Sequence, residues 1–138
     1  MILLVEDDEI LAHLFERILR GAGFAVRTCR TGLEALLMLT TEQTDIDVVL
    51  SDIGLPQLSG DQLAIQLHAL HPGMPVVLMT GFSSRVTQEN AHLFGVTTVL
   101  QKPISPRQLL LAIDDALSFA KSRRTDRQHP TILEVAER

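Results

Sequence analysis

The stretch VVLSDIGLP, residues 48–56, begins with three apolar residues and continues through Asp52 into a turn that contains glycine and proline. A short, almost continuously apolar run is typical of a strand that is covered on both faces of a parallel sheet. Similar runs occupy residues 2–5, 24–28, 76–79 and 96–100. Together with residues 48–50, they predict five strands.

Segments with helical spacing separate these runs. Residues 10–19 repeat apolar side chains at i, i+4 and i+8, which predicts an amphipathic helix. Capping-box patterns at residues 31–34, 59–62 and 105–108 predict three further helix starts. Residues 84–93 are expected to form the weakest helix, because they contain few apolar anchors. Alternating strands and helices predict an α/β fold with a parallel sheet and helices on both faces.

The composition indicates one soluble domain. The chain has 138 residues, of which 46% are hydrophobic, so it can bury a sizeable core. A net charge of −5 argues against a nucleic-acid-binding surface, which is usually basic. The single cysteine, Cys29, fits a reducing compartment, and no apolar run is long enough to span a membrane. We therefore expect a cytoplasmic protein without membrane contact.

A change in composition follows Ala120, where charged and polar residues become frequent. We expect the folded domain to occupy residues 1–120 and residues 121–138 to be a linker or a C-terminal tail. The alternative is that residues 131–134 cap a helix that leads into another domain.

Polar residues follow four of the five predicted strands. Glu6 and Asp7 follow the first, Asp52 the third, Thr80 the fourth and Lys102 the fifth. Ligands of open parallel α/β sheets bind beyond the carboxyl ends of the strands, so these side chains are candidates for one site. Each of them alone has a common structural explanation, but the combination is more informative.

The combination indicates phosphoryl transfer beside a metal ion. Three carboxylates that converge on one crevice repel one another unless a cation is present. Oxygen ligands select Mg²⁺ or Ca²⁺, and a site with few protein ligands suits Mg²⁺, which retains several waters. A carboxylate beside Mg²⁺, with an ammonium and a hydroxyl nearby, can attack phosphorus while its neighbours stabilise the developing charge.

Four motifs resemble those of receiver domains of bacterial response regulators, the phosphoaccepting modules of two-component signal transduction. They are LVEDD at residues 4–8, LSDIGLP at residues 50–56, MTG at residues 79–81 and QKP at residues 101–103. The resemblance extends from residue 2 to about residue 120 and places the receiver domain at residues 1–120. It implies a flavodoxin-like (βα)5 fold with strand order 2-1-3-4-5.

The resemblance also implies roles for individual residues. Asp52 corresponds to the phosphoacceptor, Asp7 to a direct metal ligand and Glu6 to a ligand that acts through water. Gly54 would supply a backbone carbonyl to the metal. The donor would be a phosphohistidine on a histidine kinase or a histidine phosphotransfer domain, and phosphorylation could bring about a homodimer.

Thr80 and Lys102 correspond to the hydroxyl and the ammonium that contact the phosphoryl group, and the family has a cis peptide bond between Lys102 and Pro103. Many members have an aromatic switch residue where this chain has Val99. We expect Val99 to be only a buried strand residue. The response to phosphorylation would then be carried by residues 81–84 and the helix after them.

Three alternatives compete with this interpretation. A phosphatase or phosphotransferase of the haloacid-dehalogenase type needs a second aspartate two residues after the first, where this chain has Gly54. A flavin-binding module would need aromatic rings, and the chain has only five phenylalanines as aromatic residues. A degenerate receiver that only docks partners would not need the complete polar set. We therefore expect a signalling module, not a turnover enzyme, either on its own or attached to a hybrid sensor histidine kinase.

Overall fold

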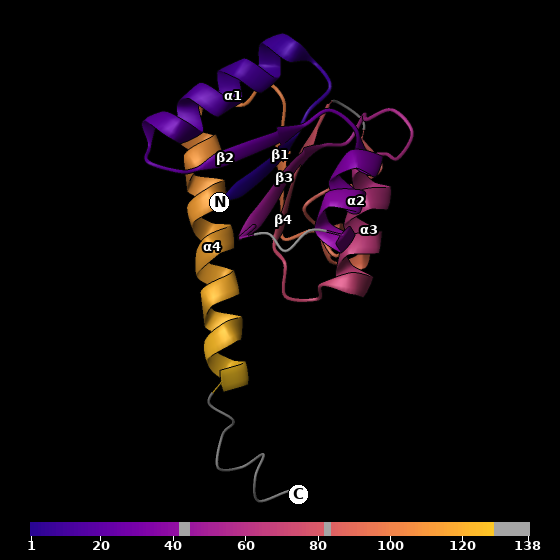
Figure 1. Cartoon of the computed structure of the whole chain (residues 1–138), viewed down its shortest axis with the longest axis vertical. Helices are drawn as coiled ribbons and strands as arrows, with labels where there is room; N and C mark the ends of the chain where they lie inside the picture. The colour runs from indigo at the N-terminus through magenta and orange to yellow at the C-terminus, as the bar shows by residue number, and fades with distance from the viewer. Residues whose placement is uncertain (42–44, 82–83, 129–138) are drawn as a thin grey trace, which may run out of the picture.

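A five-stranded parallel sheet forms the centre of the molecule (Figure 1). The computed structural model describes residues 1–41, 45–81 and 84–128, with side chains up to residue 121. The strand order is β2-β1-β3-β4-β5, which confirms the predicted flavodoxin-like topology. The strands are β1 Ile2–Val5, β2 Val26–Cys29, β3 Val48–Asp52, β4 Val76–Thr80 and β5 Thr98–Gln101.

Two layers of α-helices cover the sheet. Within the described residues these helices are α1 Glu9–Gly21, α2 Gly32–Thr41, α3 Gly60–Leu70 and α4 Pro106–Gln128. Alternate strand residues face opposite layers: Ile2 packs in the cluster that contains residues of α1 and α4, and Leu3 packs in the cluster that contains residues of α2 and α3. Burial on both faces explains why the central strands β1, β3 and β4 are almost continuously apolar, whereas the edge strand β2 exposes Arg27 and Thr28.

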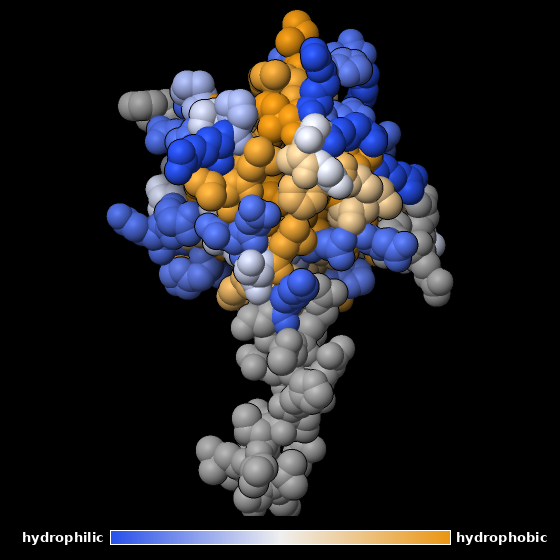
Figure 2. Space-filling view, turned by 90° about the vertical axis from the view of Figure 1, so that its left-hand side faces the viewer, coloured by the Kyte–Doolittle hydropathy of each residue, from blue (hydrophilic) through white to orange (hydrophobic). Residues whose placement is uncertain are grey.

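The surface formed by α1 and α4 carries apolar side chains among polar ones. Figure 2 views the molecule from this side and shows the apolar residues as a band between charged groups. Ile10 and Leu14 of α1 and Leu111 of α4 are exposed large apolar residues. None of the helices in the described part of the chain is long and apolar enough to cross a membrane.

Side chains cap the starts of α1 and α4. Asp8 caps α1, since its Oδ1 accepts the N–H of Leu11 at 3.0 Å. At the start of α4, the N–H of Ser105 donates to Gln108 Oε1 at 2.9 Å, and the N–H of Gln108 donates to Ser105 Oγ at 3.1 Å. This reciprocal pair is the predicted capping box.

The predicted helix at residues 84–93 is wrong. That part of the chain consists of turns followed by a short 3-10 helix, η1 Ala91–Phe94. The N–H of Thr87 donates to Asn90 Oδ1 at 2.7 Å, and the N–H of Asn90 donates to Thr87 Oγ1 at 3.3 Å. Side chains thus satisfy the backbone donors that a helix would need, so polar turn-forming residues prevail over helical structure.

Some predicted boundaries also differ from the structure. Strands β2 and β5 begin two residues later than predicted, at Val26 and Thr98. Helix α4 continues to Gln128, beyond the compositional change after Ala120. The division of the chain at residue 120 stays a prediction, and residues 131–134, the possible helix cap, lie outside the described residues.

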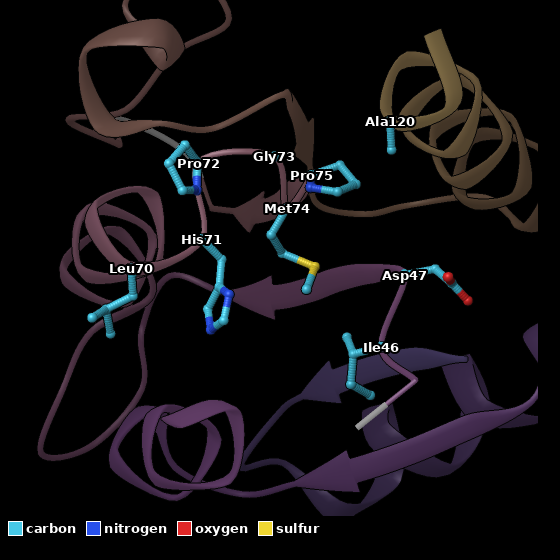
Figure 3. A pocket seen from close by; sticks show the side chains of 9 residues that line it. All are labelled: Ile46, Asp47, Leu70, His71, Pro72, Gly73, Met74, Pro75 and Ala120. Atoms are coloured by element: carbon cyan, nitrogen blue, oxygen red, sulfur yellow. The ribbon is translucent and has the colours of Figure 1, made fainter. Parts of the chain in front are cut away.

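A cavity of about 330 Å³ lies where β3 and β4 begin, at the amino end of these strands (Figure 3). The loop that joins α3 to β4 lines it together with Ile46, Asp47 and Ala120. His71, one of the lining residues, has its Nε2 3.2 Å from the carbonyl oxygen of Leu39. None of the predicted site residues lines this cavity. We therefore place the candidate functional site at the other end of the strands, where their carboxyl ends lie.

Candidate functional site

The carboxyl ends of the strands bring the predicted polar residues together. In the register of the sheet Asp52 lies opposite Met79, and Thr80 lies opposite Gln101, the residue before Lys102. One carboxylate oxygen from each of Glu6, Asp7 and Asp52 lies within 4.8 Å of the others. The strand ends therefore form one acidic cluster, as the sequence predicted.

Lys102 joins two of these carboxylates. Its Nζ lies 2.8 Å from Asp52 Oδ1 and 3.6 Å from Glu6 Oε1. Partial burial disfavours the ammonium, but the hydrogen bond to Asp52 and the attraction of both carboxylates outweigh burial and raise the pKa of Lys102. Lys102 is therefore a cation held directly against Asp52. The peptide bond between Lys102 and Pro103 is cis, as the resemblance implied.

Glu6 is the most deeply buried member of the cluster, with 1% of its surface exposed. Burial and the neighbouring Asp52 raise the pKa of Glu6 to about 7. Its Oε2 accepts the N–H of Asp8 at 3.3 Å, whereas its Oε1 has no hydrogen-bond partner. A buried carboxylate with an unsatisfied oxygen is costly unless a further cation or donor reaches it.

The backbone around Asp52 is tightly packed. A Cβ atom at Gly60 would lie 2.2 Å from the carbonyl oxygen of Asp52, so α3 can begin this close to the strand only because residue 60 is glycine. A Cβ atom at Gly54 would lie 3.6 Å from Asp52 Oδ2. Gly54 is therefore beside the carboxylate, and its predicted role as a metal ligand stays a prediction. The contact of Gly60 was not predicted.

Thr80 is 3% exposed at the end of β4. Its Oγ1 is 3.5 Å from the carbonyl oxygen of Leu100 in β5, a long hydrogen bond. Thr80 and Val99 both line a cavity of about 280 Å³ between β5 and the chain that follows β4. Val99 is half-buried, not buried as predicted, because β5 is the edge strand of the sheet.

One ion pair near the site was not predicted. Arg85 donates from Nε to Asp61 Oδ2 at 2.7 Å and from Nη2 to Asp61 Oδ1 at 2.8 Å. Asp61 is 4% exposed in the first turn of α3. The two residues are 24 positions apart, and no local pattern connects them.

A comparison with protein families agrees with this geometry. Residues 2–114 match the model of the response regulator receiver domain. The chain belongs to this family. The assignment favours the receiver interpretation over the dehalogenase-type and flavin-binding alternatives.

Curated relatives of this receiver domain are transcriptional regulators. The chain is 34% identical over 132 residues to the transcriptional regulatory protein GlrR of Escherichia coli, an alignment that covers 96% of this chain and 29% of GlrR. It is 34% identical over 127 residues to the DNA-binding transcriptional regulator NtrC of Klebsiella pneumoniae, covering 92% of this chain and 27% of NtrC. The chain thus spans less than a third of the length of these two relatives.

Solved structures show the same fold. A response regulator receiver domain protein from Clostridium thermocellum superposes with a TM-score of 0.80 at 28% identity, covering 87% of this chain and 95% of that one. NtrX from Brucella abortus superposes with a TM-score of 0.81 at 28% identity, covering 92% of this chain and 28% of NtrX.

Proposed function

We propose that this receiver domain accepts a phosphoryl group from a phosphohistidine donor onto Asp52, with Mg²⁺ bound beside it, and changes conformation in response. The observation that carries the proposal is the position of Asp52, which lies against Lys102 and within an acidic cluster. Incubation with a small acyl phosphate and Mg²⁺ should raise the mass of the protein by one phosphoryl group. No increase in mass would favour the alternative of a degenerate receiver that only docks partners.

The residues present fit a magnesium ion. The cluster offers three carboxylates and one ammonium, that of Lys102, which lies 3.6 Å from Glu6 Oε1 without a hydrogen bond to it, so a further cation would offset the remaining negative charge. We propose that Asp7, Asp52 and the carbonyl of Gly54 hold Mg²⁺ directly and that Glu6 acts through a water molecule. When bound, Mg²⁺ would supply positive charge that stabilises the negative charge on the phosphoryl group during transfer.

Asp52, Lys102 and Thr80 have separate roles in the transfer of the phosphoryl group. A carboxylate oxygen of Asp52 forms a bond to phosphorus while the bond from phosphorus to the donor imidazole nitrogen breaks, and the imidazole leaves with that electron pair. The ammonium of Lys102 moves from the free carboxylate to a phosphoryl oxygen, and the hydroxyl of Thr80 donates to another. The domain serves as a signalling switch in this proposal, not as a turnover enzyme.

Partners of the whole protein are part of the same proposal. The donor would be a histidine kinase or a histidine phosphotransfer domain, and the domain itself would not contact nucleic acid. The two curated relatives described above are transcriptional regulators, which favours an output through a further domain over attachment to a hybrid kinase. A cytoplasmic location and a homodimer after phosphorylation stay predictions.

Replacement of Asp7 by alanine should abolish magnesium binding. Few protein ligands imply a modest affinity, so loss of one direct ligand should weaken binding about 100-fold or more. Titration with MgCl₂, followed through the amide chemical shifts of residues 6–8 and 52–54, measures the affinity. Asp115→Ala on the exposed surface of α4 removes the same charge elsewhere and should leave binding unchanged. Binding that survives Asp7→Ala would mean that the metal ligands are misassigned.

Replacement of Lys102 by alanine should permit some phosphorylation but blunt the conformational response. A phosphoryl group adds a charge of about −1.5 to −2, and the ammonium, 2.8 Å from Asp52 Oδ1, is close enough to follow it. Amide shifts on addition of beryllofluoride, a phosphoryl mimic, should fall at least about twofold in the segment after Thr80. Lys121→Ala is the matched control. A full response in Lys102→Ala would show that Lys102 does not sense the new charge.

A further inference from the structure

The chain that follows Thr80 is fastened to α3 by one buried carboxylate. Asp61 accepts two parallel hydrogen bonds from Arg85, a bidentate geometry that is among the stronger side-chain contacts. Asp61 is nearly inaccessible, whereas the side chain of Arg85 is 63% exposed. Burial opposes the charge of Asp61, yet the two hydrogen bonds from Arg85 help to lower its pKa below the usual value. The contact is therefore ionic at neutral pH and can be broken by movement of its exposed partner.

Two further side-chain contacts define the arrangement of residues 85–90. Gln88 Oε1 accepts the N–H of Val99 in the edge strand β5 at 2.9 Å. Asn90 Nδ2 donates to the carbonyl oxygen of Arg85 at 2.9 Å. The segment is thus attached to α3 on one side and to β5 on the other by side chains, with the cavity of about 280 Å³ beneath it. Val86 of the same segment is 1% exposed and packs in the hydrophobic core. The segment is therefore held by one apolar anchor and a few polar contacts instead of an α-helix, and a change of position exchanges only those polar contacts.

The ion pair also connects the two parts of the chain that flank the site. Arg85 follows Thr80 by five positions, and Asp61 directly follows Gly60, whose Cα lies against the carbonyl of Asp52. In this arrangement the hydroxyl of Thr80 is directed to the Leu100 carbonyl in β5. The ion pair is therefore formed while the hydroxyl of Thr80 is directed to β5.

We propose that the Arg85–Asp61 ion pair is a latch that holds residues 84–90 in the unphosphorylated arrangement and opens when Asp52 is phosphorylated. This inference rests on the proposed function, in which the hydroxyl of Thr80 turns from the Leu100 carbonyl in β5 to a phosphoryl oxygen on Asp52. The latch gives this chain a way to couple the site to its surface without an aromatic residue at position 99. Its free energy sets how much of the population stays in the resting arrangement.

The test removes the latch and measures the affinity for beryllofluoride in the presence of Mg²⁺. Arg85→Met keeps an apolar stem but removes the guanidinium, so the resting arrangement loses stability and binding should tighten about fivefold. Amides of residues 84–94 in the free variant should move toward their positions in the wild-type beryllofluoride complex. Asp61→Asn should act in the same direction, and the double variant should bind no more tightly than Arg85→Met, because both substitutions remove one interaction.

Two controls make the result specific. Arg20→Met removes another arginine–carboxylate pair, with Glu16 on α1 at 3.0 Å, and should leave the affinity unchanged. Arg85→Lys keeps the positive charge but lacks the planar guanidinium, so its affinity for beryllofluoride should lie between those of the wild type and Arg85→Met. If Arg85→Met does not fold, Arg85→Lys provides the test.

Each outcome counts for or against the latch. Unchanged or weaker binding by folded Arg85→Met, while the wild type binds, overturns the latch and leaves the proposed function intact. Additive effects of the two substitutions would show that Arg85 and Asp61 act separately and would also overturn it. Failure of the wild type to bind beryllofluoride overturns the proposed function, and the latch with it.

Discussion

Asp52→Asn should lose phosphoryl incorporation, by about 100-fold or more, because an amide lacks the anionic oxygen that attacks phosphorus. Asparagine has nearly the same shape as aspartate, so the packing of Gly60 against the backbone of residue 52 is preserved. The variant should therefore fold like the wild type and still lose the modification. Intact-mass spectrometry after incubation with a small acyl phosphate and MgCl₂ measures the result directly.

The control for this experiment is Asp8→Asn. Asp8 is next to the acidic cluster in sequence, and its side chain caps α1. Asparagine is as good an N-cap as aspartate, so this variant should retain the modification. Digestion of the wild-type protein should place the phosphoryl group on the peptide that contains Asp52. Incorporation by Asp52→Asn at the wild-type rate would exclude Asp52 as the acceptor.

The fold and the composition of the site could be predicted because both depend on short-range patterns. Residues 48–52 show the principle: an apolar run predicts a covered strand, and the aspartate at its end must then lie at the carboxyl edge of the sheet. The same argument placed Glu6, Thr80 and Lys102 there. Spacing along the chain therefore determined which side chains meet, although not their distances or the long hydrogen bond of Thr80 to β5.

Contacts between distant parts of the chain were not predictable in the same way. The Arg85–Asp61 pair depends on how the chain after β4 packs against α3, and its two residues share no local motif. Residues 84–93 do not form the predicted helix, because Thr87 and Asn90 form reciprocal hydrogen bonds that stabilise a turn. The scarcity of apolar residues indicated only that a helix there would be weak. Both features involve the segment that follows β4, where the local sequence gives the least information.

Glu6→Gln should stabilise the metal-free domain at neutral and alkaline pH. Burial and the nearby Asp52 raise the pKa of Glu6 to about 7 in the folded state, above its ordinary value of 4.5. The unfolded protein therefore releases this proton at lower pH than the folded protein does. The contribution of this group to the free energy of unfolding is greatest below about pH 4.5. It is lost as the pH rises through 7, because the folded state must then hold an unfavourable buried charge.

The size of this effect follows from the same values. A rise in pKa from 4.5 to about 7 corresponds to a loss of about 3 kcal/mol of folding free energy between acidic and alkaline pH. Glutamine has no proton to release, so the variant should lose this dependence and gain up to that amount at pH 8. The lowered pKa of Asp61 acts in the opposite direction and only below its ordinary value of 3.8, so it does not contribute between pH 5 and 8.

Urea unfolding in EDTA at several pH values between 5 and 8 measures the difference between Glu6→Gln and wild type. Glu89→Gln, which alters an exposed carboxylate, is the matched control and should follow the wild-type curve. A cation that binds the cluster offsets the charge of Glu6, so MgCl₂ in place of EDTA should reduce the advantage of the variant. If Glu6→Gln is less stable than wild type at pH 8 in EDTA, the buried carboxylate is a stabilising partner of Lys102, and its proposed need for a cation is wrong.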